Sequence, residues 1–303
     1  MKSTHSLPVL DLEDYRIRIQ LDQCWNRPEP EESLSADSQH ELVGQLLEQI
    51  TGQTPSDRWG TANEARRALY SLLIQASPGS WSEAQLQAID QLLSSERQNK
   101  ASRDSNYIAP ELDQEGGKTQ LQIWRGDITT LACDAIVNAA NSALLGCFRP
   151  DHPCIDNAIH AAAGPRLRDD CAAIMTLQGH PEPTGAAKIT RAYNLPCRYV
   201  LHTVGPIHRG DNMIKKESDD LAKAYLSCLN LAKRIPSIKT LAFCGISTGV
   251  FGFPANRACQ IAVKTVEQWL KNHPNHFQTI IFNVFSIRDE LLYQQRLGNT
   301  EHG

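Results

Sequence analysis

The most reactive stretch of this 303-residue sequence is the loop CFRPDHPC, which holds Cys147, His152 and Cys154 within eight residues. Cysteine and histidine are the ligands that Zn²⁺ prefers, and three protein ligands with a fourth position open are typical of a catalytic zinc site. The prolines of the loop, Pro150 and Pro153, reduce the entropy lost when a tight chelate forms. The spacing C-x4-H-x-C therefore predicts a metal site with these three residues as ligands.

Other roles stay open for this loop. Its cysteines could be small hydrophobic residues buried beside a helix, although a proline-rich loop is a poor place for core thiols. No fourth soft ligand lies nearby in the sequence, so the open position is an inference. Folding could still bring in one of four further side chains, those of His160, Cys171, His202 and Cys244.

Asp156 opens the segment DNAIHAAAG directly after the loop. A carboxylate in the first turn of a helix complements the helix dipole. Beside a metal, the same carboxylate could orient or deprotonate a hydroxyl or a water, and the two roles are compatible. His160 follows one turn later on the same face of the helix, and we interpret it as a core histidine.

Two polar motifs follow predicted strands. GDIT places Asp127 after LQIW, and NAAN places Asn138 and Asn141 after DAIV. Either motif could be purely structural, because Asp and Asn cap turns and tolerate left-handed backbone. Ligands of α/β proteins collect at the carboxyl ends of strands, so both motifs are also candidates for ligand binding.

A glycine-rich segment, GISTGVFGFP (residues 245–254), joins the strand TLAFC to a helix. Small residues here let backbone N–H groups approach an anion, and the helix N-terminus adds a favourable dipole. The segment is neither a Walker A loop nor G-x-G-x-x-G, so a nicotinamide dinucleotide is not indicated. Phe285, at the end of the last predicted strand, could stack on a flat ring, but core packing is the commoner role of phenylalanine.

An alternation of strands and helices that begins near residue 120 must position these residues. Short runs rich in β-branched residues predict strands at 121–126, 134–140, 186–193, 198–205, 240–246 and 278–285. Helices are expected between and after them, at about 156–175, 218–234, 255–271 and 288–296. Several strands are almost continuously apolar, as in a sheet covered on both faces. The pattern predicts a three-layer α/β domain.

The front of the chain predicts a different unit. Residues 1–37 mix Pro, Glu and Ser and indicate a loosely ordered arm. Apolar residues at three- and four-residue spacing then predict amphipathic helices at 40–50, 62–76 and 81–98, with Ser38 and Ser82 as candidate N-caps. The polar stretch 99–119 predicts a linker. We therefore divide the chain into an arm (1–37), a helical extension (38–115) and an α/β domain (116–303). The acidic front half could screen or contact a target protein, but we favour the role of covering a face of its neighbour.

Composition excludes several classes of protein. No run approaches the ~18 apolar residues of a membrane span, and the N-terminus lacks the features of a signal or transit peptide. We expect a cytoplasmic protein whose nine cysteines are reduced and mostly core residues. Residues 1–118 carry 11 Lys and Arg against 19 Asp and Glu, and the remainder carries 19 against 15. Residues 119–303 therefore have only a weak net positive charge, which argues against nucleic-acid binding and is compatible with a small anionic ligand.

Four segments in this order, GDIT, NAAN, IDNAIHAAAG and STGVFGFP, resemble the motifs of macrodomains over about residues 119–297. The resemblance implies a three-layer macrodomain fold with a mixed central sheet flanked by helices, and ADP-ribose binding. MacroD-type hydrolases carry a run of glycines before the helix, where this sequence has CFRPDHPC. That departure, together with the helical N-terminal extension, resembles the zinc-dependent macrodomains, which are protein ADP-ribosylhydrolases.

The resemblance also implies site residues. Those expected to bind ADP-ribose are Asp127, Ile128, Asn141, Cys154, Ile155, Asp156, Ser247, Thr248, Gly249, Val250 and Phe251. Asp127 and the Ile128 backbone would recognise the adenine, Asn141 the distal ribose, and residues 247–251 the diphosphate and distal ribose. Zn²⁺ would lie beside that ribose on Cys147, His152 and Cys154. Asn141 and Asp156 are the implied catalytic residues.

The implied activity is zinc-dependent hydrolysis of the C1″ bond between mono-ADP-ribose and a protein side chain, which releases ADP-ribose. The family suggests an acidic side chain and hence an ester. Zinc could activate a water or grip the ribose hydroxyls, and the sequence does not separate these roles. The alternative is a non-enzymatic ADP-ribose reader, which needs no metal; a phosphoester hydrolase would need carboxylate clusters that are missing. The resemblance also implies a functional link to a sirtuin-type ADP-ribosyltransferase.

Overall fold

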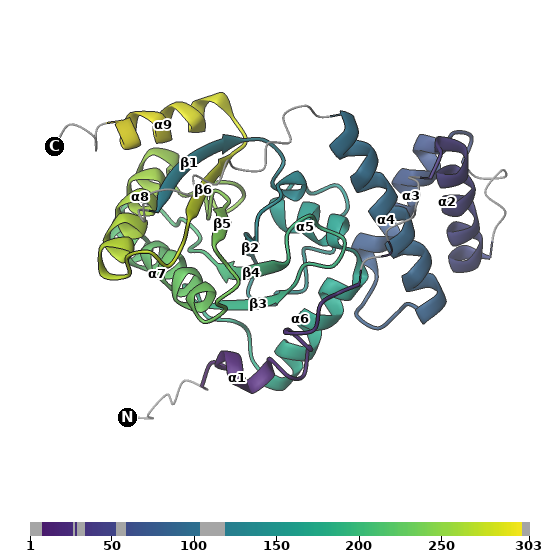
Figure 1. The fold of residues 1–303 in the computed structure, drawn as a ribbon, viewed down its shortest axis with the longest axis horizontal. Coiled ribbons are helices and arrows are strands. Elements are labelled where there is room, and N and C mark those ends of the chain that lie inside the picture. Colours follow the sequence, from purple (N-terminus) through teal and green to yellow (C-terminus); the bar gives the residue numbers. More distant parts are fainter. Residues whose placement is uncertain (1–7, 27, 29–33, 53–58, 104–118, 299–303) are drawn as a thin grey trace.

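The computed structural model describes residues 8–26, 28, 34–52, 59–103 and 119–298. Its helices and strands alternate in the second half of the chain, whereas the first half is helical (Figure 1). The first-half elements are α1 (Leu12–Tyr15), α2 (Ala36–Thr51), α3 (Ala62–Gln75) and α4 (Glu83–Arg103). The second-half elements are β1 (Gln120–Arg125), β2 (Ala135–Ala140), α5 (Ile155–Ala163), α6 (Pro165–Gln178), β3 (Ala187–Arg191), β4 (Tyr199–Val204), α7 (Ile214–Lys233), β5 (Thr240–Phe243), α8 (Ala255–Asn272), β6 (Thr279–Val284) and α9 (Ile287–Gly298).

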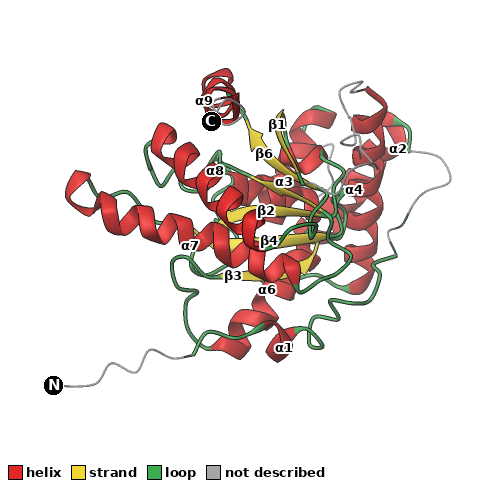
Figure 2. Cartoon of the chain, turned by 60° about the vertical axis from the view of Figure 1, so that its left-hand side comes forward, coloured by secondary structure: helices red, strands yellow, loops and turns green. Residues whose placement is uncertain are grey.

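The six strands form one mixed sheet in the order β1-β6-β5-β2-β4-β3. All neighbouring strands are parallel except β3, which pairs with β4 in antiparallel fashion. Helices α5 and α6 lie on one face of the sheet and α7, α8 and α9 on the other (Figures 1 and 2). The predicted fold class, a three-layer α/β domain with a mixed sheet and a helical N-terminal extension, is confirmed, and each predicted strand is present.

The sheet is the centre of the hydrophobic core. Every residue of β4, β5 and β6 is buried, as the nearly continuous apolar runs predicted. Because β1, β2, β5 and β6 are mutually parallel along the sheet, their carboxyl ends meet at one edge. The segments that follow these ends are the ones that carry the candidate site residues.

The helix predicted over 156–175 is in fact two helices, α5 and α6, which meet at Gly164. Gly164 has a φ of 89°, and a Cβ there would lie 3.0 Å from Cδ1 of Leu93 in α4. Glycine therefore allows both the turn and the close approach of the extension. Pro165, at the first position of α6, starts the second helix.

The helical extension has a small core of its own, formed where α2, α3 and α4 pack together. Ser35 caps α2, since its hydroxyl accepts from the Ser38 N–H, so the N-cap expected at Ser38 lies three residues too late. Ser82 does cap α4, and its hydroxyl accepts from the Gln85 N–H. Helix α4 continues to Arg103, so residues 99–103 of the predicted linker are helical, while 104–118 lie outside the described residues.

The stretch 8–26 differs from the loosely ordered arm expected over 1–37. Leu12, Tyr15, Ile19 and Leu21 are buried in the core of the α/β domain. The Tyr15 hydroxyl accepts a hydrogen bond of 3.0 Å from the backbone N–H of Ile189 in β3. Burial of these four side chains fixes the stretch to the domain. Residues 1–7, 27 and 29–33 of the predicted arm lie outside the described residues.

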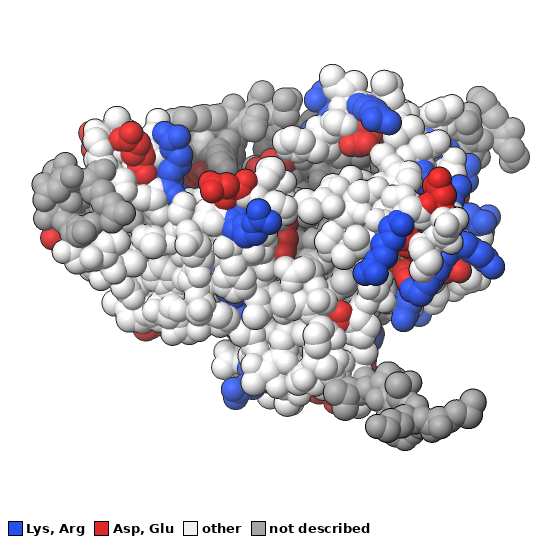
Figure 3. Space-filling model, turned by 180° about the vertical axis from the view of Figure 1, so that it is seen from behind, with Lys and Arg blue, Asp and Glu red and all other residues white. Residues whose placement is uncertain are grey.

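Two surface properties bear on the classes of partner. Within the described residues, none of the helices combines the length and the apolar character that a membrane span requires. On the face seen in Figure 3, Lys and Arg side chains lie among Asp and Glu side chains rather than in a continuous basic stripe.

Candidate functional site

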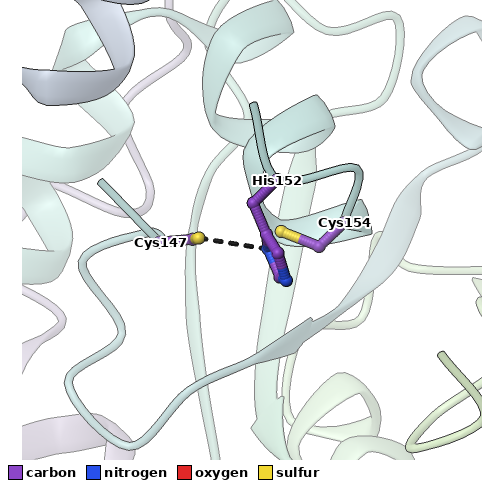
Figure 4. Close-up of side chains that lie close together, drawn as sticks. All are labelled: Cys147, His152 and Cys154. Atoms are coloured by element: carbon purple, nitrogen blue, oxygen red, sulfur yellow. Dashed lines mark hydrogen bonds between the residues drawn. The ribbon is translucent and has the colours of Figure 1, made fainter. Parts of the chain in front are cut away.

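The three predicted metal ligands lie together. The ligand atoms of Cys147, His152 and Cys154 are all within 4.8 Å of one another, and Sγ of Cys147 is 3.2 Å from Nδ1 of His152. All three side chains are partly exposed. Figure 4 shows both sulfur atoms directed toward the imidazole ring. The loop thus gathers two thiols and an imidazole at one accessible point, as the C-x4-H-x-C spacing predicted.

Asn157 holds the triad loop in shape, a role that no clear pattern in the sequence indicated. Its side-chain amide donates to the carbonyls of Arg149 and His152 at 2.7 and 3.1 Å. Cys154 is the N-cap of α5, where its sulfur accepts from the Asn157 backbone N–H at 3.5 Å. One residue therefore closes the loop and links it to the rigid first turn of the helix.

The donor set fits a zinc ion. Two thiols and an imidazole match the ligands of three-coordinate protein sites that keep a position open. Burial raises the pKa of the Cys154 thiol to about 11, which favours the protonated form. A bound cation would lower that pKa and favour the thiolate that coordination requires. The positive end of the α5 dipole also favours a thiolate at its N-cap.

Asp156 lies just inside the helix that Cys154 caps, and it is buried. Asn138 donates from Nδ2 to its Oδ1 at 2.8 Å, and Nδ2 of Asn141 is 3.5 Å from its Oδ2. Burial raises the pKa of Asp156 to about 6, partly offset by the hydrogen bond from Asn138 and the charge of Arg168. The structure thus brings together Asn141, Asp156 and the triad, which the sequence suggested only through separate motifs.

A second cluster of metal-type side chains, His160, Cys171 and His202, lies buried below Asp156. Both nitrogens of His202 already have hydrogen-bond partners, since Nδ1 is 3.1 Å from Nδ2 of Asn138 and Nε2 is 3.0 Å from the Thr190 hydroxyl. His160 is buried, as expected of a core histidine, but among the described residues neither ring nitrogen has a hydrogen-bond partner, and Nε2 lies 3.5 Å from Oδ1 of Asp156. This cluster is therefore a polar part of the core, and it supplies no fourth ligand to the triad.

Asp127 and Asn141 take the strand-end positions expected of them. Asp127 is exposed, and its Oδ1 accepts from the N–H and hydroxyl of Thr129 at 3.0 and 2.7 Å. Within the described residues, Oδ2 of Asp127 has no such partner and can accept from a ligand. The Ile128 side chain is buried, so only its backbone can take part in binding. The Asn141 amide holds the Gly146 carbonyl at 2.8 Å.

The loop between β5 and α8 is built to present backbone N–H groups. Ser247 has a φ of 65°, and its carbonyl accepts from the Phe253 N–H, which closes the loop. Among the described residues, no hydrogen bond engages the N–H groups of Gly249, Val250 and Phe251. Helix α8 starts at Pro254 without a side-chain cap, so its first N–H groups are also open. Such a cradle suits a phosphate group.

Two further features of this edge differ from the sequence analysis, which gave no signal for Gly205 and favoured core packing for Phe285. Gly205, at the end of β4, packs so closely under the loop that a Cβ would lie 2.1 Å from Oγ of Ser247. Phe285, where β6 ends, is 83% exposed, so core packing does not account for it. The contact joins Gly205 to Ser247, 42 positions later in the chain, which no local pattern in the sequence reveals.

A cavity of about 280 Å³ lies where the extension meets the α/β domain. Its lining includes Arg66, Tyr70 and Glu96 from the extension and Asp127 and Ala158 from the domain. The sequence had suggested only that the extension covers a face of its neighbour. The cavity shows that the extension does not fill the whole interface and leaves an open volume beside α5.

An α/β domain that gathers polar side chains and open N–H groups at the carboxyl edge of its sheet belongs to the broad class of ligand-binding α/β proteins. Within that class, the sequence model of the Macro domain matches residues 137–262. The chain belongs to the Macro domain family, in agreement with the resemblance of its motifs.

Three known proteins illustrate the relationship. The chain is 57% identical over 182 residues to a protein-ADP-ribose hydrolase of Treponema medium, covering 60% of this chain and 69% of that one. It is 44% identical over 223 residues to a probable bifunctional ADP-ribose hydrolase/ADP-ribosyltransferase of Fusarium oxysporum, covering 70% of this chain and 37% of that one. The Trypanosoma brucei macrodomain in complex with ADP-ribose superposes with a TM-score of 0.55 at 30% identity, covering 77% of this chain and 95% of that one.

Proposed function

We propose that this chain is a zinc-dependent hydrolase that removes mono-ADP-ribose from modified protein side chains and releases ADP-ribose. The observation that carries the proposal is the convergence of Asn141, Asp156 and the Cys147–His152–Cys154 triad at one edge of the sheet. A relative that is 57% identical is named a protein-ADP-ribose hydrolase, which supports the same activity for this chain.

In this proposal, ADP-ribose binds to the segments that follow the ends of the strands. Oδ2 of Asp127 accepts from the exocyclic amine of adenine, beside the Ile128 backbone, and Phe285 stacks on the base. The open N–H groups of residues 249–251 and the start of α8 hold the diphosphate, with Ser247 and Thr248 completing the loop. The distal ribose then lies between Asn141 and residues 154–156, next to the triad.

Hydrolysis relies on positioning and proton transfer by residues of the chain. Asn138 holds Oδ1 of Asp156 at 2.8 Å, whereas the contact of Oδ2 with Asn141 is longer, at 3.5 Å, so Oδ2 is the atom that accepts a proton from a ribose hydroxyl or from the attacking water. Asn141 fixes the loop ahead of the triad through the Gly146 carbonyl and keeps the distal ribose in register. Bond cleavage at C1″ yields ADP-ribose and the free side chain.

Cys147, His152 and Cys154 would hold the zinc ion. When bound, zinc supplies a Lewis acid that either polarises a water or orients the ribose hydroxyls. An acidic modified residue, and hence an ester, belongs to this proposal, because a carboxylate leaves without being protonated by the enzyme.

Two wider expectations also belong to the proposal. A functional link to an ADP-ribosyltransferase, sirtuin-type in our reading, is favoured by a relative whose name joins the two activities. A cytoplasmic location is favoured by the cysteines, all nine of which are free.

The rival function is an ADP-ribose reader that uses the same cleft only for binding. A reader has no need of the metal triad, and this is the observation that favours the hydrolase. The test is to incubate the zinc-loaded full-length chain with a mono-ADP-ribosylated protein and to blot for the modification. We expect the signal to disappear and free ADP-ribose to accumulate. A persistent signal, together with tight ADP-ribose binding, would establish the reader instead.

A further inference from the structure

Arg168 of helix α6 is a buried cation that the proposed chemistry does not use. Only 3% of the residue is exposed. Its Nη1 donates to the carbonyls of Leu73 and Ala76 at 2.9 and 2.6 Å, and its Nε donates to the carbonyl of Leu145 at 2.9 Å. Three carbonyls therefore compensate a charge that would otherwise be costly to bury.

Two of these carbonyls belong to the end of α3 in the extension. Leu73 lies in the last turn of that helix, and Ala76 is its C-cap. The last carbonyls of a helix have no partner within the helix, and they form the negative end of its dipole. Arg168 thus caps α3 from another domain, and the extension in turn supplies the polar groups that this buried guanidinium needs.

The same guanidinium contacts the loop that carries the first metal ligand. It lies over the Phe148 ring at 4.7 Å from the ring centroid, and Phe148 follows Cys147 directly. Leu145, whose carbonyl it holds, precedes Gly146. A Cβ on Gly146 would lie 3.3 Å from Nη2 of Arg168, so the loop packs tightly against the cation.

Gly146 links this contact to the ribose end of the cleft, because its carbonyl accepts from the Asn141 amide at 2.8 Å. We propose that Arg168 is a positioning residue that holds loop 145–148 against helix α3, so that the extension sets both the zinc affinity of the triad and the placement of Asn141. The inference rests on the proposed function for its catalytic meaning, whereas the contacts themselves do not depend on it.

Arg166 offers a matched control, two residues earlier on the same helix. It joins α6 to the extension through Asp90 and Glu83, with bonds of 2.8 and 2.6 Å, and among the described residues it has no hydrogen bond or ion pair with the triad loop. Loss of either arginine should weaken the attachment of the extension. Only the loss of Arg168 should disturb the metal site.

The experiment compares the full-length wild type with Arg168→Ala, Arg168→Lys and Arg166→Ala. Zinc affinity is measured by competition with a chromogenic chelator, and ADP-ribose affinity by calorimetry on metal-free protein. We expect Arg168→Ala to weaken zinc binding about 10- to 100-fold, the range typical of residues that orient metal ligands. Lysine cannot reproduce the guanidinium fork, so Arg168→Lys should also lose at least about tenfold. ADP-ribose binding by Arg168→Ala should weaken about fivefold or more. For Arg166→Ala, the zinc affinity and the ADP-ribose affinity should both stay within about twofold of the wild-type values.

The inference is overturned if Arg168→Ala keeps its zinc and ADP-ribose affinities, or if Arg166→Ala loses as much. Should Arg168→Ala fail to fold, Phe148→Leu removes the stacking contact alone and is expected to weaken zinc binding about threefold or more; unchanged zinc affinity in that variant contradicts the inference. A wild type that binds zinc but leaves the modified protein intact refutes the proposed hydrolase and not this inference. If the wild type binds no zinc, the ADP-ribose affinities of the wild type and the variants decide whether Arg168 positions Asn141.

Discussion

Asn138 of strand β2 donates a hydrogen bond of 2.8 Å from Nδ2 to Oδ1 of Asp156, in the first turn of helix α5, which packs against that strand. Both residues are buried, so the bond solvates a carboxylate that water barely reaches. The other carboxylate oxygen, Oδ2, lies 3.5 Å from Nδ2 of Asn141. The first asparagine of NAAN therefore orients the acid, while Asn141 holds the loop before the triad.

Replacing Asn138 with alanine should leave the buried carboxylate without its donor. We expect the free energy of unfolding to fall by about 1–3 kcal/mol and kcat to fall at least about tenfold, because Asp156 is no longer held in one orientation. Thermal melts and turnover of a mono-ADP-ribosylated protein measure the two effects. Asn230→Ala, which removes a hydrogen bond to Trp269 far from the cleft, is the control and should affect stability alone. Equal kcat in both variants would contradict the orienting role.

Replacing Phe285 with alanine tests the adenine end of the cleft. The ring is 83% exposed, so its loss should change the free energy of unfolding by less than about 0.5 kcal/mol. If the ring stacks on adenine, ADP-ribose affinity should fall about fivefold or more. Calorimetry with ADP-ribose measures this, and Leu291→Ala on α9, 58% exposed, is the control. An unchanged affinity would show that the adenine lies elsewhere.

Replacing Gly205 with alanine tests the proposed phosphate-binding role of the loop between β5 and α8 without altering any residue in that loop. The new Cβ would lie 2.1 Å from Oγ of Ser247 and 2.7 Å from Cγ2 of Ile246, so the loop has to move. We expect an overpacking cost of about 1–3 kcal/mol and at least about tenfold weaker ADP-ribose binding. Gly60→Ala in the extension, whose Cβ would meet only Glu64 at 3.5 Å, is the control. Wild-type affinity in Gly205→Ala would refute the proposed phosphate site.

Local patterns predicted much of this molecule. Five of the six strands lie within the predicted ranges, and β1 starts one residue before its range, at Gln120, because short runs rich in β-branched residues mark each strand. The grouping of Cys147, His152 and Cys154 was predictable because the three residues lie within eight positions of the sequence, where spacing alone brings them together. The helix break at Gly164 was missed because the apolar spacing continues through it, although the pair Gly164-Pro165 was a local signal for the turn.

Contacts between distant segments account for what the sequence did not reveal. Arg168 and Gly205 matter because of the residues that folding places against them, Leu73 and Ser247 among others. The burial of Leu12, Tyr15 and Ile19 had a local signal, since these residues are three and four apart, but the Pro- and Glu-rich stretch that follows obscured it. Polar residues thus revealed the site where they were clustered, and not where they act through tertiary contacts.

The most direct test of the account is a paired measurement of zinc content and hydrolysis in Cys154→Ala. Cys24→Ala, which removes an exposed free cysteine remote from the triad in the sequence, is the matched control. Wild type and Cys24→Ala should each carry about one zinc per chain, the content expected of one three-ligand site, and should remove mono-ADP-ribose from a modified protein. Cys154→Ala should carry no zinc and show no turnover. A zinc-free Cys154→Ala that hydrolyses at the wild-type rate would contradict the account.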